Sequence, residues 1–96
     1  MSTMFVSYVG GVQHGVATGP ISATTIDTGT TTQKTATAAP SGAQIAIVFS
    51  PDAAHYVATG PQATVEASAA RGIYVPANTE RHLAIGPGVG VAAITV

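Results

Sequence analysis

The stretch Ala43-Gln-Ile-Ala-Ile-Val-Phe49, followed at once by Ser50-Pro51-Asp52, sets the pattern for the second half of this chain. An apolar, β-branched run of this length that stops at a proline turn is typical of a β-strand. Short runs and turns alternate in the same way up to the last residue, and the further expected strands are residues 55–58, 62–67, 72–75, 82–85 and 91–96. This spacing predicts an all-β fold, a small antiparallel β-sandwich or β-barrel that is jelly-roll-like.

The first half adds an N-terminal segment and two further candidate strands. Residues 4–9 are mostly β-branched, aromatic or otherwise apolar, and both faces of the expected strand are largely apolar. Residues 12–20 are expected to be a loop that could act as an extended arm. Residues 21–27 predict a strand, and the Thr-rich run 30–39 an edge strand with two polar faces. We therefore divide the chain into residues 1–20, an N-terminal strand and possible arm, and residues 21–96, a single β-sandwich domain.

The strand at residues 43–49 also predicts which side chains form the core. Ile45, Ile47 and Phe49 share one face of it, which we expect to point inward, whereas Ala46 and Val48 point the other way. Further residues expected in the core are Tyr56, Ile73, Val75, Leu83 and Ile85.

The composition indicates a small domain that associates with other surfaces. The chain has 96 residues; 46% are hydrophobic, but many of these are Ala, and aromatic residues make up only 5%. Since Ala offers little area to bury, we expect part of the stability to come from copies of the chain or from a partner. Charged residues are 7% of the chain, against about 25% in a typical soluble domain, which fits a partly covered exterior.

The charge and hydropathy patterns argue against several classes of partner. A net charge of −1 provides no basic surface for nucleic acid or anionic membrane. No apolar run approaches the ~20 residues of a membrane span, and the N-terminus lacks the pattern of a signal peptide. We therefore expect a chain made in the cytoplasm and not individually exported, with neither nucleic acid nor membrane as a partner.

No motif indicates catalysis, a metal or a cofactor. His14, His55 and His82 lack zinc-ligand spacing, and the chain has no Cys. We expect these histidines to be solvated, although His55 near Asp52 and His82 beside Glu80 could form acid–base pairs or a pH-sensitive interface. There is no Gly-x-Ser-x-Gly elbow, and the glycine-rich turn at residues 86–90 lacks the ending of a phosphate-binding loop. We therefore expect a protein that is not an enzyme and has no catalytic, cofactor-binding or metal residues.

Three pieces of the second half resemble a known class of proteins. They are Ala54-His-Tyr-Val-Ala-Thr-Gly60-Pro61, Ile73-Tyr-Val-Pro76-Ala-Asn-Thr79, and Leu83-Ala-Ile-Gly86-Pro-Gly88 followed by Val91-Ala-Ala-Ile94. Together they resemble the small β-sandwich structural proteins of tailed bacteriophage virions, which occur as head-decoration, spike or adaptor components. The resemblance covers residues 43–96 and brings no catalytic residues with it.

The resemblance implies a virion structural protein located on the capsid surface and made in the cytoplasm of the bacterial host. The first expectation is a capsid decoration, or cement, protein that forms a homotrimer on the lattice of the major capsid protein. It would stabilise the shell by binding only the assembled lattice, with many weakly bound copies acting together. The alternatives are a head–tail adaptor and a tail or spike component. A carbohydrate-binding or adhesin module is a further alternative, disfavoured because Tyr8, Tyr56 and Tyr74 are dispersed and Trp is absent.

The two ends of the chain are the predicted contact regions. Residues 4–9 and 91–96 are apolar on both faces, and an exposed strand edge of that kind would aggregate. The residues that we predict at interfaces between subunits are Phe5, Val6, Tyr8, Val91, Ile94 and Val96.

Overall fold

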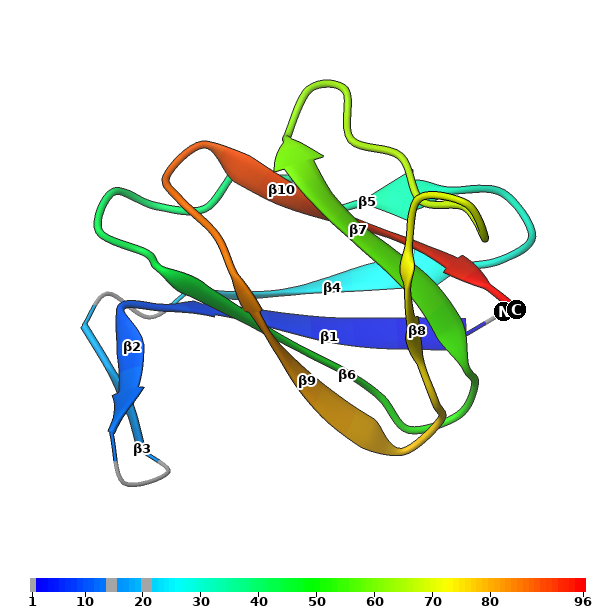
Figure 1. The fold of residues 1–96 in the computed structure, drawn as a ribbon, viewed down its shortest axis with the longest axis horizontal. Helices are drawn as coiled ribbons and strands as arrows, with labels where there is room; N and C mark the ends of the chain where they lie inside the picture. The colour runs from blue at the N-terminus through cyan, green and yellow to red at the C-terminus, as the bar shows by residue number, and fades with distance from the viewer. Residues whose placement is uncertain (1, 14–15, 20–21) are drawn as a thin grey trace.

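The computed structural model describes residues 2–13, 16–19 and 22–96, and within these residues it contains β-strands and no helix (Figure 1). The strands are β1 (Ser2–Val9), β2 (Gly11–Gln13), β3 (Val16–Thr18), β4 (Ser22–Thr28), β5 (Gln33–Lys34), β6 (Ile45–Ser50), β7 (His55–Pro61), β8 (Ile73–Val75), β9 (Thr79–Ala84) and β10 (Val89–Thr95). In this part of the chain, two four-stranded antiparallel sheets form the sandwich, with orders β4-β1-β6-β9 and β5-β10-β7-β8. The predicted all-β fold class is confirmed.

The chain winds back and forth between the two sheets. From β4 to β7, successive strands alternate between the first and the second sheet, and β8, β9 and β10 lie in the second, first and second sheets. This alternation is typical of a jelly roll. Both terminal strands are central: β1 lies between β4 and β6, and β10 lies between β5 and β7. A central position explains why both strands are apolar on two faces.

The sequence prediction for the inner face of β6 is wrong. Ala46 and Val48 are fully buried in the core, whereas Ile45, Ile47 and Phe49 lie on the outer face and are partly buried. Both faces of β6 are apolar, so the alternation of its side chains does not determine which set points inward. The small Ala46 lies directly opposite Tyr8 in β1 and leaves space for that large side chain.

The core lies between the two sheets. Val75 and Leu83 are buried in it as predicted, and Ile85 packs against it. Ile73 is 52% exposed and Tyr56 is only partly buried, and neither belongs to the core cluster, so the predicted core places of Ile73 and Tyr56 are wrong. The buried apolar residues of this cluster are Met4, Val6, Tyr8, Ile26, Ala39, Ala43, Ala46, Val48, Val57, Val75, Leu83, Val91 and Ala93.

The segment after β7 was predicted to be a strand and is not one. β7 continues through Gly60 to Pro61, where a turn was expected, and the chain then turns as Val65 N–H donates to the Pro61 carbonyl oxygen (2.9 Å). Val65 and Ala67 are buried against Ala92 on the outer face of the second sheet. Buried and exposed residues alternate here as they do in a strand. The buried side chains cover the outer face of the second sheet, however, and the segment is not part of a strand.

Two further segments differ from their predicted structure. Residues 11–13 and 16–18, expected to be a loop, pair as the antiparallel strands β2 and β3 and form a hairpin that extends from the sandwich at the lower left of Figure 1. The Thr-rich run 30–39 does lie at a sheet edge, but its strand is reduced to β5. Residues 14, 15 and 20 of the predicted arm lie outside the described residues.

Candidate functional site

The outer face of the first sheet carries a continuous apolar stripe. Phe5 of β1 lies directly opposite Phe49 of β6, and Ile47 and Ile45 follow at alternate positions of β6. Phe5 is 47% exposed, and the other three side chains are partly buried. We call Phe5, Ile45, Ile47 and Phe49 the apolar stripe.

Polar and small side chains flank the apolar stripe on both edge strands. In β4, Thr25 lies opposite Phe5, and in β9, Glu80 and His82 lie opposite Phe49 and Ile47. His82 Nε2 lies 2.8 Å from Glu80 Oε1, and both side chains are exposed, so the pair adds at most about 1 kcal/mol to stability. An apolar centre with a polar rim is the usual anatomy of a protein interface.

The predicted interface residues fall into two groups. Phe5 lies on the surface, and so does Val96, whose side chain is 67% exposed. Ile94 is partly buried on the outer face of the second sheet. Val6, Tyr8 and Val91 are fully buried in the core of the single chain and are therefore not available to a partner. The other members of the apolar stripe were missed because they were assigned to the core. The signal that could have identified them is the apolar character of both faces of residues 43–49.

His55 is buried, so the expectation that it is solvated is wrong. Its exposed fraction is 0%, and its Nε2 lies 2.6 Å from Thr28 Oγ1. Burial lowers the pKa of His55, and the Ala53 backbone and the Asp52 carboxylate offset this effect in part. The expected surface position of His82 is confirmed, and His14 lies outside the described residues.

A second buried polar contact joins the two sides of the sandwich. The Tyr8 hydroxyl donates to Thr35 Oγ1 (3.0 Å), and Thr35 is held next to β10 because its N–H donates to the Val91 carbonyl oxygen (2.9 Å). Burial raises the pKa of Tyr8, with a smaller opposing effect from the hydrogen bond to Thr35. The contact satisfies two polar groups inside the core and is structural in character.

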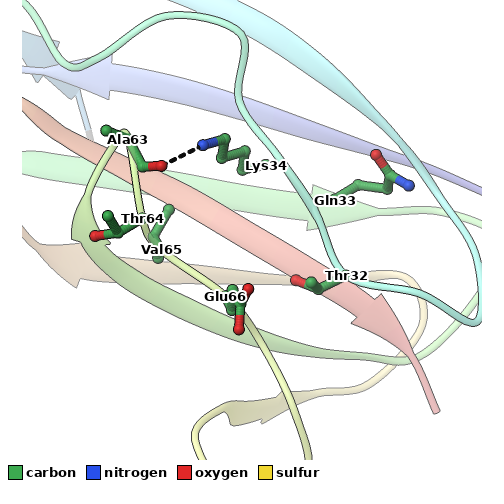
Figure 2. A pocket seen from close by; sticks show the side chains of 7 residues that line it. All are labelled: Thr32, Gln33, Lys34, Ala63, Thr64, Val65 and Glu66. Atoms are coloured by element: carbon green, nitrogen blue, oxygen red, sulfur yellow. Dashed lines mark hydrogen bonds between the residues drawn. The ribbon is translucent and has the colours of Figure 1, made fainter.

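A hollow of about 250 Å³ lies beside β5 (Figure 2). Its volume is below the ~300–1,000 Å³ of typical small-molecule sites. Lys34 Nζ donates to the Ala63 carbonyl oxygen (2.8 Å), which ties the β5 edge to the turn after β7. The lining offers no pairing of a nucleophile with a base, and no cluster of three metal-ligating side chains occurs among the described residues. The lining residues are Thr32, Gln33, Lys34, Ala63, Thr64, Val65 and Glu66.

Two tyrosines that are distant in the sequence meet on the outer face of the second sheet. Tyr56 of β7 lies opposite Tyr74 of β8, with ring centroids 5.9 Å apart and an interplanar angle of 62°. Tyr74 is 50% exposed. The tyrosines are therefore less dispersed than the sequence suggested, although the edge-to-face rings do not form one flat surface.

A scan against models of known protein families, a search of curated proteins and a search of solved structures each gave no significant match. In the part of the chain that the structure describes, no helix is long and apolar enough to cross a bilayer.

Proposed function

We propose that this chain is a virion structural protein of a tailed bacteriophage, a decoration protein that binds the assembled lattice of the major capsid protein. The proposal is supported by the resemblance of residues 43–96 to such proteins and by the low content of charged residues. The observation that carries it is the apolar stripe, where Phe5 and Phe49 lie side by side on a sheet face with a polar rim.

The stripe is suited to weak binding repeated many times. Covering about 100 Å² of an exposed Phe ring contributes about 2 kcal/mol. The four strands of this face are six to eight residues long. At about 4.8 Å between strands and about 3.3 Å per residue, the face covers about 400 Å². A standard interface buries about 800 Å² per partner, so one such face binds weakly alone. Assembly as a homotrimer and binding to a lattice would convert weak contacts into a stable coat.

The test is the copy number of this chain in purified particles of its source virus, measured by quantitative mass spectrometry against the major capsid protein. A decoration protein is expected in a number equal to the capsid subunits or to a simple fraction of it. A handful or a dozen copies would replace the proposal with a head–tail adaptor or a tail or spike component. Absence from the particle would contradict a structural role in the virion.

A carbohydrate-binding or adhesin module is the second candidate, and the Tyr56–Tyr74 pair is the observation that favours it. Exposed aromatic rings stack on the apolar faces of sugars, and Tyr74 is the more exposed of the two. Glycan-array binding that is lost in Tyr74→Ala and kept in Phe5→Thr would support this candidate over the capsid proposal. Absence of binding to any glycan would remove it.

A further inference from the structure

The buried contact between Thr28 and His55 lies next to the attachment of the C-terminal strand. Thr95 donates to the Gly29 carbonyl oxygen from its backbone N–H (3.0 Å) and from its Oγ1 (2.8 Å). The Val96 N–H donates to the Ala54 carbonyl oxygen (3.1 Å). Gly29 directly follows Thr28, and Ala54 directly precedes His55. Both acceptors that hold the end of β10 therefore belong to residues next in sequence to the two residues of one buried contact.

The His55 ring is held as a neutral group. Its Nε2 is engaged with Thr28, and its buried Nδ1 has no hydrogen-bond partner among the described residues. The Ala53 backbone lies near the ring, but its geometry falls outside that of a formed hydrogen bond. A protonated ring would carry an N–H at both nitrogens, so the charge would be buried and the Nδ1 proton would have only the poorly aligned Ala53 backbone near it.

Few charged groups face the ring to compensate for such a charge. The neighbours on the strands packed against it are Thr28 of β4, Val75 of β8 and Thr95 of β10, none of which is charged. Asp52, in the turn before β7, is the charged group that favours protonation, but it is exposed and Ser50 Oγ donates to it (3.0 Å). Its attraction is screened by solvent and is smaller than the effect of burial.

We propose that the Thr28–His55 contact is an acid-sensitive latch, and that protonation of His55 releases the C-terminal end of β10. The charged ring reaches solvent, or an acceptor in the turn at residues 52–54, only if it moves away from Thr28. That movement separates the carbonyl groups of Ala54 and Gly29, and the hydrogen bonds of Thr95 and Val96 break. The latch belongs to the fold itself and does not depend on what the chain binds.

The test is hydrogen exchange of single backbone amides in the full chain, measured by NMR and corrected for the intrinsic pH dependence of exchange. Protection of the Thr95 and Val96 amides is expected to fall about tenfold per pH unit on acidification below about pH 6.5, until His55 is protonated in the closed state. The Thr35 and Ala39 amides, which donate to Val91 and Val89 further along the same strand, serve as internal controls and keep their protection.

His55→Gln removes the titration, and in this variant the protection of the Thr95 and Val96 amides is expected not to change with pH. His82→Gln is the matched control, because that histidine is exposed, and it should behave as the unmodified protein does. If His55→Gln does not fold, the titration midpoint of His55, measured by NMR in the unmodified protein, tests the latch instead. A midpoint at or above about 6.5, or a parallel loss of protection at all four amides, would overturn the latch.

Discussion

Phe5 of β1 and Phe49 of β6 lie directly opposite each other on the outer face of the first sheet. Two neighbouring aromatic rings at the centre of an exposed face are the strongest candidates for a contact with a partner. Phe5→Thr is expected to lower the free energy of unfolding by no more than about 2 kcal/mol, because only about half of the Phe5 side chain is buried within the chain and Thr suits a strand.

The same variant should weaken binding to capsids that lack the protein by about tenfold or more, which co-sedimentation can measure. Thr25→Ala changes the residue next to Phe5 on the same face and serves as the control. Equal binding by Phe5→Thr and Thr25→Ala would show that the apolar stripe is not the contact surface.

Val48 and Ile47 test which face of β6 points inward. Val48 is fully buried, so Val48→Ala leaves a cavity and should cost about 2 kcal/mol. Ile47→Ala removes a larger side chain from the outer face and should cost less than Val48→Ala. Urea unfolding of the two variants makes the comparison, and the reverse order of costs would contradict the observed orientation.

Gly90 and Gly86 differ in the space that surrounds them. A Cβ at Gly90 would lie 2.9 Å from the Cα of Gln62, whereas a Cβ at Gly86 would meet nothing within 4 Å. Gly90→Ala is therefore expected to destabilise the fold by about 2 kcal/mol, because backbone must shift. Gly86→Ala should be neutral or stabilising by up to about 1 kcal/mol. Thermal unfolding distinguishes them, and a Gly90→Ala variant as stable as Gly86→Ala would refute the close contact.

The buried hydroxyl of Tyr8 should affect stability, unlike the exposed one of Tyr74. Tyr8→Phe removes the donor to Thr35 Oγ1 and is expected to cost about 1 kcal/mol, whereas Tyr74→Phe should be nearly neutral. Chemical unfolding at neutral pH measures both, and equal stability of the two variants would count against a role for the Tyr8–Thr35 contact.

Alkaline pH offers a second test of Tyr8. Because burial raises its pKa in the folded chain, the unfolded chain loses the proton first, and stability should fall as pH rises above about 10. Tyr8→Phe should remove this part of the pH dependence. An unchanged alkaline slope in that variant would mean that another group is responsible.

The all-β class and most of the strand positions could be predicted from the amino-acid pattern alone. Short β-branched runs that end at Pro and Gly are local signals, and they correctly predicted strands at β1, β4, β6, β7, β8, β9 and β10. It also indicated that the terminal strands are unusual, since both are apolar on two faces, and both proved to be central.

The packing of the two sheets sets which face of each strand points inward and which distant residues meet. On β6 both faces are apolar, so burial of Val48 rather than Ile47 depends on the opposing sheet and on the buried cross-strand neighbour Val6. His55 is buried and meets Thr28 of β4, which lies 27 residues earlier in the chain, and no local sequence pattern indicates that contact. Local sequence specifies that side chains alternate between the two faces of a strand. Which face points into the core, and which residues meet at long range, depend on how the two sheets pack.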